Sequence, residues 1–136
     1  MQCLLKAAGL RPSSLDDGLA AALSELARST PIPVDVAATR ERLPEPIEAA
    51  AYFVACEAVT NAVKHGSPSS IRIDAARHDG AVHVVVADDG VGGAVARPGS
   101  GLAGLADRLG AHGGTLVVDS RPGTGTRVEA VIPCGS

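Results

Sequence analysis

The sequence predicts an α/β two-layer sandwich, in which helices cover one face of a mixed, mostly antiparallel β-sheet. Two runs of alternating apolar and polar residues, 71–75 and 82–86, are joined by the turn signal Asp79-Gly80 and predict a hairpin. Two segments with helical character, 15–28 and 45–65, precede that hairpin. The chain has 136 residues and no internal repeat, so we expect one domain with its own core.

The first helix and the first strand are expected before residue 40. Apolar residues at helical spacing predict an amphipathic helix over residues 15–28: Leu15, Leu19, Leu23 and Leu26. Ser13 and Ser14 are suited to cap its first turn, because a hydroxyl oxygen accepts a hydrogen bond from a free backbone N–H group there. The proline-containing stretch 30–33 ends this helix, and residues 34–37 are expected to form a short edge strand.

The longest helix is expected over residues 45–65. This stretch is rich in alanine and contains no glycine or proline after Pro46, which is tolerated in a first helical turn. Its buried stripe is expected to consist of Ile47, Ala51, Val54, Ala58 and Val63. Gly66-Ser67-Pro68 then ends the helix.

The C-terminal part of the chain is expected to complete the sheet and to add one helix. A glycine-rich stretch, 92–101, follows the first hairpin and is expected to be flexible. The helix after it ends at Gly113-Gly114 and is indicated by Leu102, Leu105 and Leu109. Residues 116–118 and 127–132 alternate as two strands do, which predicts a second hairpin.

Composition excludes several classes of partner. Tyr52 and Phe53 are the only aromatic residues, so the chain has no platform on which single-stranded bases could stack. A net charge of −3 argues against a nucleic-acid backbone as partner. No run approaches the roughly 20 apolar residues of a membrane span, so we expect no direct membrane contact by this domain. Cys3, Cys56 and Cys134 lack metal-ligand spacing, which favours free thiols in a reducing cytoplasm.

The first motif with chemical content, Glu57-Ala58-Val59-Thr60-Asn61-Ala62-Val63-Lys64-His65, ends the longest predicted helix. Glu57, Asn61 and Lys64 lie at i, i+4 and i+7, so they share one helix face. The Asn61 carbonyl oxygen suits Mg²⁺, and Lys64 can pair with phosphate as a point charge. Glu57 can accept a proton from an attacking group or orient it. Taken alone, a solvated helix face explains the same pattern.

The second motif, Asp88-Asp89-Gly90-Val91-Gly92, follows a predicted strand directly. A carboxylate at the end of a strand is well placed for a binding site, and that of Asp88 can accept a hydrogen bond from the exocyclic amine of adenine. Gly90 and Gly92 let the backbone turn sharply beside a flat ligand. An ordinary Asp-Gly turn is the alternative explanation.

The third motif, Gly99-Ser100-Gly101-Leu102-Ala103-Gly104-Leu105, leads into a predicted helix. Bare backbone N–H groups at a helix N-terminus bind anions such as phosphate, and Gly104 is expected to permit close packing of the first turn. The motif lacks the Gly-Lys-Ser/Thr of a P-loop and the preceding parallel strand of a dinucleotide fingerprint. Its alternative is a mobile loop without a ligand.

The fourth motif, Gly123-Thr124-Gly125-Thr126, opens the last predicted strand. The Thr126 hydroxyl could share adenine recognition with Asp88, although this motif carries little information alone. His78, His83 and His112 show no metal-ligand spacing, so they are interpreted as surface or packing residues.

Taken in order, the four motifs resemble those of the ATP-binding catalytic domain of sensor histidine kinases, within the gyrase–Hsp90–kinase–MutL ATPase superfamily. The N box, G1 box, G2 box and last glycine motif of that family are matched by residues 57–65, 88–92, 99–105 and 125–126. Residues 9–15 and 101–114 look most like the NarL/DesK-type subfamily. The resemblance covers nearly the whole chain.

The resemblance implies a Bergerat-type sandwich that binds Mg-ATP. It implies catalytic roles for Glu57 and Asn61, with Asn61 also the ligand of Mg²⁺, and adenine recognition by Asp88. The full set that it assigns to nucleotide binding is Asn61, Lys64, His65, Asp88, Gly90, Gly92, Gly99, Gly101, Leu102, Gly104 and Thr126.

In this family the γ-phosphate of ATP passes to a histidine on a separate dimerisation domain, and a response regulator acts downstream. By resemblance, residues 1–12 are the remnant of the preceding dimerisation helix or linker, and residues 13–136 are the catalytic domain. None of the four histidines here is positioned to replace the acceptor. The short lid 93–98 lacks the family's aromatic box, as the subfamily resemblance suggests.

Two other functions remain as alternatives at this point. An anti-sigma-factor-type serine kinase has a very similar N box, and would bind a sigma factor and phosphorylate a small antagonist protein. The pattern Gly101-Leu102-x-Gly104-Leu105-x-x-Arg108-Leu109 favours the histidine kinase. A nucleotide-binding module that has lost transfer is the third reading, and intact Glu57, Asn61 and Asp88 speak against it.

Overall fold

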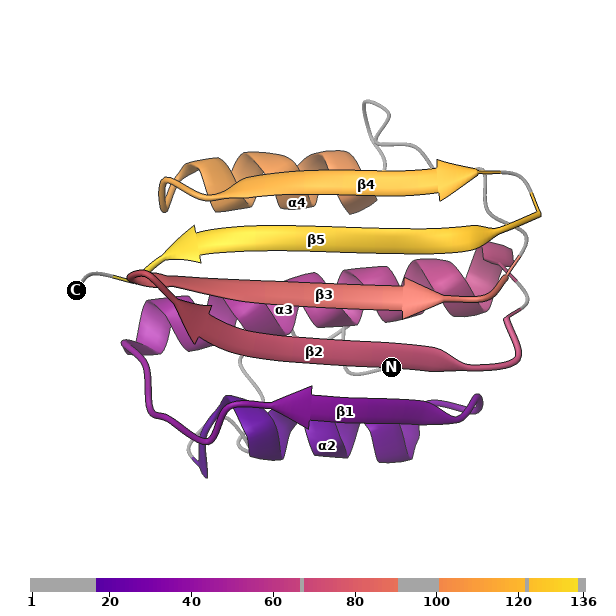
Figure 1. The fold of residues 1–136 in the computed structure, drawn as a ribbon, viewed down its shortest axis with the longest axis horizontal. Coiled ribbons are helices and arrows are strands. Elements are labelled where there is room, and N and C mark those ends of the chain that lie inside the picture. The colour runs from indigo at the N-terminus through magenta and orange to yellow at the C-terminus, as the bar shows by residue number, and fades with distance from the viewer. Residues whose placement is uncertain (1–16, 67, 91–100, 122, 135–136) are drawn as a thin grey trace.

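The structure is a computed structural model, and it describes residues 17–66, 68–90, 101–121 and 123–134. The elements follow one another as α2 (Leu19–Ser29), β1 (Val34–Ala38), α3 (Glu45–Asn61), the π-helical turn η2 (Ala62–Gly66), β2 (Ile71–His78), β3 (Ala81–Asp88), α4 (Gly101–Gly110), β4 (Thr115–Arg121) and β5 (Gly125–Pro133) (Figure 1).

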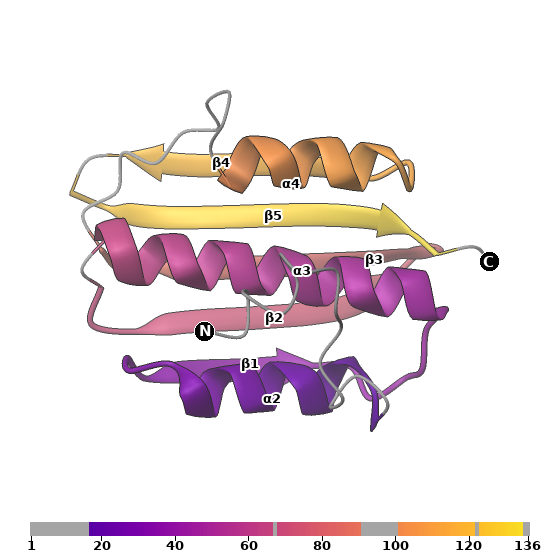
Figure 2. The same cartoon turned by 180° about the vertical axis from the view of Figure 1, so that it is seen from behind.

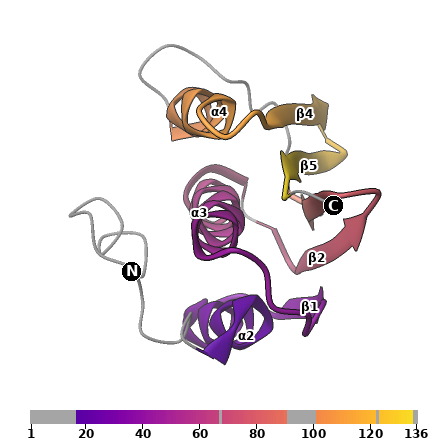
Figure 3. The same ribbon diagram turned by 90° about the vertical axis from the view of Figure 1, so that its left-hand side faces the viewer.

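The five strands form one sheet in the order β1-β2-β3-β5-β4. Strand β1 pairs with β2 in parallel, and α3 makes the crossover between them, whereas all other neighbours are antiparallel. Helices α2, α3 and α4 lie on the same side of the sheet, as the end-on view shows (Figure 3). The predicted two-layer sandwich with a mixed, mostly antiparallel sheet is therefore confirmed.

Helix α2 begins later than the sequence predicted. The expected start at residue 15 is wrong, because Gly18 has a φ of 103°, outside the helical region, and the first helical residue is Leu19. The proposed caps, Ser13 and Ser14, lie outside the described residues. The apolar side of the helix is buried as expected, through Leu19, Ala22, Leu23 and Leu26.

Helix α3 starts as predicted but changes geometry before its expected end. It is α-helical as far as Asn61, and the wider turn η2 replaces the α-helix over the last predicted residues. Ile47, Ala51, Val54 and Ala58 are buried, whereas Val63 is only half-buried. The difference at Val63 follows from η2, since a π-helical turn contains more residues and shifts the following side chains around the axis.

A buried carboxylate holds the loop that leads into α3. Glu48 is 1% exposed and accepts hydrogen bonds from Arg42 Nε at 3.2 Å and Arg42 Nη2 at 3.3 Å. The backbone N–H of Leu43 donates to the same carboxylate at 3.2 Å. Since a buried charge without partners is costly, these three bonds account for an acid inside an otherwise apolar core.

The core lies between the helices and the sheet face that they cover. On β3, Val82, Val84 and Val86 are buried and alternate with half-buried residues, which confirms the predicted period of two. Leu105 and Leu109 of α4 are buried and close the core above β4 and beside α3. None of the helices in the described ranges combines the length and apolar character needed to span a membrane.

The predicted turn between β2 and β3 forms where expected, whereas the end of α4 differs from the prediction. Asp79 and Gly80 both have positive φ, 53° and 76°, as the hairpin between β2 and β3 requires. Helix α4 stops at Gly110, before the predicted stop at Gly113-Gly114, and Gly114 N–H donates to Leu109 O at 2.7 Å to close the helix end. The second hairpin is present, with strands longer than expected.

Gly125 permits a close approach between β5 and the end of β3. Its φ of 88° is left-handed, and a Cβ at this position would collide with the Asp88 carbonyl oxygen and lie 3.1 Å from Asp89 Cα. Glycine alone combines this backbone conformation with this spacing.

Asp89 ties the end of β3 to the start of β2. Its carboxylate accepts hydrogen bonds from the backbone N–H groups of Ser69 at 2.8 Å and Ser70 at 3.1 Å, and from the Ser69 hydroxyl. These bonds, the Ser69 hydroxyl first, hold the pKa of Asp89 below its ordinary value, because they stabilise the ionised form.

We expect Gly125→Ala to destabilise the fold by about 2–4 kcal/mol, from backbone strain and from the collision with Asp88. Gly123→Ala is the matched control, since Gly123 also has a left-handed φ of 83° but no described atom lies within 4 Å of the added methyl. Urea unfolding measures both. Equal losses in the two variants would contradict the close approach.

We expect Asp89→Asn to lower stability at neutral pH, by an amount that vanishes in acid. A lowered folded pKa contributes stability above the unfolded value of about 3.9, and this contribution is lost as pH falls through the folded pKa. Urea midpoints of the wild type and the variant should therefore converge below pH 4. Asp35→Asn, on the exposed side of β1, serves as the control. If the urea midpoints of the wild type and Asp89→Asn differed by the same amount at every pH, the linkage would be refuted.

Candidate nucleotide site

Three elements that carry the sequence motifs meet at one end of the sheet. The C-terminal end of α3, the end of β3 and the start of β5 lie together, on the right in Figure 1 and on the left in Figure 2. Helix α3 contacts both β3 and β5, and η2 contacts β5. The fold therefore gathers motifs that are separated by more than 60 residues in the sequence.

Asp88 and Thr126 face each other across two neighbouring strands. They are register partners in the β3–β5 ladder. Asp88 lies two residues after the buried Val86, and Thr126 lies two residues before the buried Val128. Because side chains alternate along a strand, both point to the helix-covered face. Asp88 Oδ1 accepts a hydrogen bond from Gly90 N–H at 2.8 Å, which orients the carboxylate at the strand end.

Glu57 and Asn61 belong to a half-buried stripe on α3, whose members recur every four residues: Ala49, Phe53, Glu57 and Asn61. The predicted shared face is confirmed for Glu57 and Asn61, which lie one turn apart. Asn61 is the last α-helical residue and the only asparagine of the chain. Within the described ranges, no other side chain carries a carboxamide group.

Lys64 does not follow the spacing on which its prediction rested. The i+7 relation assumes a continuous α-helix, whereas Lys64 lies within the π-helical turn η2, which shifts it around the axis relative to Asn61. Its side chain is exposed. His65 lies in the same turn, and its side chain is outside the described part of the structure.

Along the helix axes, the N-terminus of α4 lies close to the position of Asn61 on α3. Arg108 stacks on the ring of Phe53, with 3.7 Å between its guanidinium carbon and the ring centroid. The two helices run in opposite directions (Figure 2). Gly101 precedes Arg108 by seven residues, about 10 Å of helix, and Asn61 follows Phe53 by eight residues, about 12 Å. The first turn of α4 therefore lies beside the end of α3.

The glycine-rich loop is described only in part. Gly92 and Gly99 lie outside the described residues, as does the side chain of Leu102, whereas Gly90 is buried and Gly101 is the first residue of α4. The prediction that Gly104 allows close packing is wrong. Gly104 is exposed, and no described atom lies within 4 Å of the position that a Cβ would take.

Sequence reasoning missed two residues near this end of the sheet. Asp89 was given no role within its motif, although its carboxylate accepts hydrogen bonds from the backbone N–H groups of Ser69 and Ser70. Ser120 of β4 was not considered, and its hydroxyl lies 2.7 Å from the Thr126 hydroxyl. The two hydroxyls become neighbours only through the register of β4 and β5, so the sequence carried no signal for the pair.

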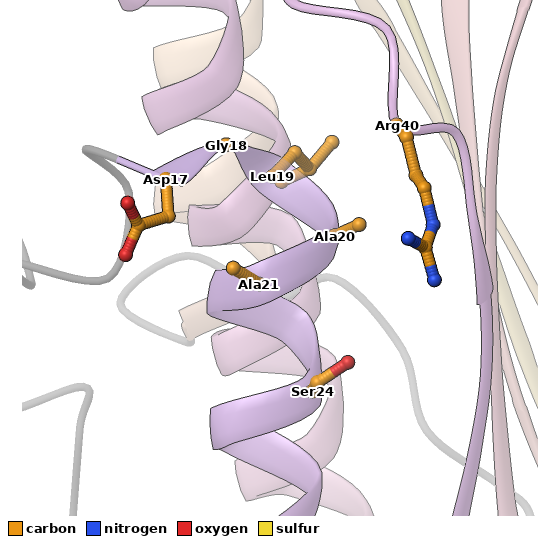
Figure 4. Close-up of a pocket in the computed structure, with 7 residues that line it drawn as sticks. All are labelled: Asp17, Gly18, Leu19, Ala20, Ala21, Ser24 and Arg40. Carbon is orange, nitrogen blue, oxygen red and sulfur yellow. The ribbon is translucent and has the colours of Figure 1, made fainter.

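A cavity of about 320 Å³ lies elsewhere, at the start of α2 (Figure 4). Its lining consists mainly of small residues of α2, with Arg40 reaching along the helix and the Asp17 carboxylate turned away. None of the predicted site residues lines it. We therefore assign the candidate site from the motif residues and not from this cavity.

Comparison with known proteins identifies the relatives of this chain. The chain is 36% identical over 104 residues to an uncharacterised sensor-like histidine kinase of Chloroflexus aurantiacus, covering 70% of this chain and 17% of that protein. It is 32% identical over 137 residues to the signal transduction histidine-protein kinase/phosphatase UhpB of Salmonella typhimurium, covering 91% of this chain and 26% of that protein. The chain thus spans about a quarter or less of these relatives.

Solved structures show the same fold. The histidine kinase domain of the Erythrobacter litoralis blue-light activated kinase EL346 superposes with a TM-score of 0.68 at 25% identity, covering 85% of this chain and 57% of that one. The mycobacterial sensor histidine kinase MprB gives a TM-score of 0.62 at 23% identity, covering 85% and 91%.

The family model described as histidine kinase-, DNA gyrase B-, and HSP90-like ATPase matches residues 47–136. The match takes in α3, β3, α4 and β5, the elements that carry the four motifs. The chain therefore belongs to the family of histidine kinase-, DNA gyrase B- and HSP90-like ATPases.

Proposed function

We propose that this chain is the catalytic domain that transfers the γ-phosphate of ATP to a histidine on a separate dimerisation domain of a sensor histidine kinase. Membership of an ATPase family makes ATP the nucleotide bound. The relatives named above are sensor histidine kinases, which favours this function over the anti-sigma-factor-type serine kinase. A response regulator would then receive the phosphate.

The observation that carries the proposal is the meeting of Asn61, Asp88 and Thr126 at one end of the sheet, beside the N-terminus of α4. The Asp88 carboxylate can accept a hydrogen bond from the adenine amine, and the Thr126 hydroxyl lies next to it on the same face. Backbone N–H groups at the start of α4 offer a site for phosphate, whose negative charge the helix dipole favours.

The residues present fit Mg²⁺ as a partner of the nucleotide. No three His, Cys, Asp or Glu side chains in the described ranges gather to hold a metal by themselves. Mg²⁺ does not need such a cage, since it commonly keeps water and phosphate oxygens and takes one or two protein ligands. Asn61 would supply the protein oxygen, and the ion would neutralise charge on the phosphates.

The remaining side chains position the reacting groups. Glu57 lies one turn before Asn61 on the same stripe, where its carboxylate can accept a proton from the attacking imidazole or orient it. Transfer forms a bond between the histidine nitrogen and the γ-phosphorus, breaks the bond to the bridging oxygen and leaves ADP. Positioning and charge neutralisation account for most of the catalysis of such steps.

We expect Asp88→Asn to weaken ATP binding roughly 10- to 100-fold, because an ionised hydrogen-bond acceptor is lost. Asn61→Asp should instead reduce transfer about 100-fold or more, since it adds a negative charge beside the phosphates. Calorimetry with and without Mg²⁺ and transfer to the dimerisation helices of the full-length protein measure both effects. Asp35→Asn on β1 is the control. Wild-type ATP binding in Asp88→Asn, or wild-type phosphate transfer in Asn61→Asp, would show that the substituted residue does not belong to the site.

We expect the isolated chain to take up no stable label from γ-labelled ATP. His83 lies five residues before Asp88 on β3, about 17 Å away, and His78 and His112 lie at the same far end of the sheet. When the dimerisation helices are added, label should appear on those helices and not on this chain. His65→Gln tests the one histidine near the site, and label on the wild-type chain that this variant abolishes would contradict a separate acceptor.

A further inference from the structure

The end of the sheet carries a row of three polar residues beside an apolar row on the same covered face. Ser120, Thr126 and Asp88 are register partners across β4, β5 and β3. The next row along the same face consists of Val118, Val128 and Val86. The change from three valines to three hydrogen-bonding side chains occurs in a single step, at the end of the sheet where the nucleotide is proposed to bind.

Ser120 and Thr126 share a hydrogen bond that limits what the Thr126 hydroxyl can do. Their oxygens are 2.7 Å apart, and both residues are half-buried, so water competes only partly for the bond. A hydroxyl group has one proton and two lone pairs. When Ser120 donates, one lone pair of Thr126 is used and the Thr126 proton is left to point away from β4.

Either hydroxyl can be the donor in this bond. We propose that Ser120 donates it and is thereby a positioning residue that directs the Thr126 hydroxyl proton toward the bound base, and so contributes to selection of adenine over guanine. The inference rests on the proposed function and names a determinant of its substrate class. Ser120 touches the Thr126 hydroxyl and acts on the base only through it.

The edge of adenine matches this arrangement, and the edge of guanine does not. Adenine presents an exocyclic amine, which donates, next to the ring nitrogen N1, which accepts. Asp88 accepts from the amine and a donating Thr126 satisfies N1. Guanine presents a carbonyl oxygen and an N1–H group at the same positions, so an acceptor would face an acceptor and a donor a donor. Unpaired polar groups of this kind are costly in a partly buried site.

The test is calorimetry of the full chain with ATP, GTP and 1-deaza-ATP, which lacks the N1 acceptor. Ser120→Ala should weaken ATP binding roughly three- to tenfold, leave binding of 1-deaza-ATP at the wild-type level, and so reduce the preference for ATP over GTP. Ser120→Thr, which keeps the hydroxyl, should retain the wild-type affinity for ATP and the preference for ATP over GTP. In a Thr126→Val background, Ser120→Ala should have no further effect on ATP binding.

Ser29→Ala is the matched control, because it removes a hydroxyl that donates to Leu26 O at 3.0 Å on the remote helix α2. Equal weakening of ATP and 1-deaza-ATP by Ser120→Ala, or no change with either, would overturn the inference while leaving the proposed function intact. A wild-type chain that binds no ATP at all would overturn both.

Discussion

The candidate site depends on the close approach of β5 to the end of β3. Gly125 has a left-handed backbone and leaves no room for a side chain against the Asp88 carbonyl. This contact brings Thr126 into register with Asp88, so that a carboxylate and a hydroxyl lie side by side on the helix-covered face. Any larger residue at 125 would separate the strands at the point where the two polar side chains must meet.

A second set of contacts holds the rest of the site around this pair. The Asp89 carboxylate ties the end of β3 to the start of β2, and the Asp88 carboxylate is oriented by the Gly90 amide. On the helix side, the stacking of Arg108 on Phe53 aligns α4 against α3. The strand end proposed to bind adenine and the helix end proposed to bind phosphate are thereby held by separate interactions.

Charge plays a local part in this arrangement. The chain has a net charge of −3, yet it belongs to a family that binds the highly anionic nucleotide ATP. In the proposed function, anion binding would therefore rest on backbone amides at the start of α4 and on a metal ion bound with the nucleotide, and not on a basic surface. The same reasoning explains why one amide side chain, Asn61, has a larger expected role than the exposed Lys64.

The sequence alone determined the two-layer architecture and the order of most elements, and it named Asn61, Asp88 and Thr126 as candidates for the site. These features are local: alternation, helical spacing, turn residues and short motifs are visible within a few residues. Only the tertiary structure decided the late start of α2 at Leu19, the π-helical turn that moves Lys64, the open surroundings of Gly104, and the Ser120–Thr126 hydrogen bond. Each of these depends on backbone conformation or strand register, which arise from packing between distant segments and leave no periodic trace in the sequence.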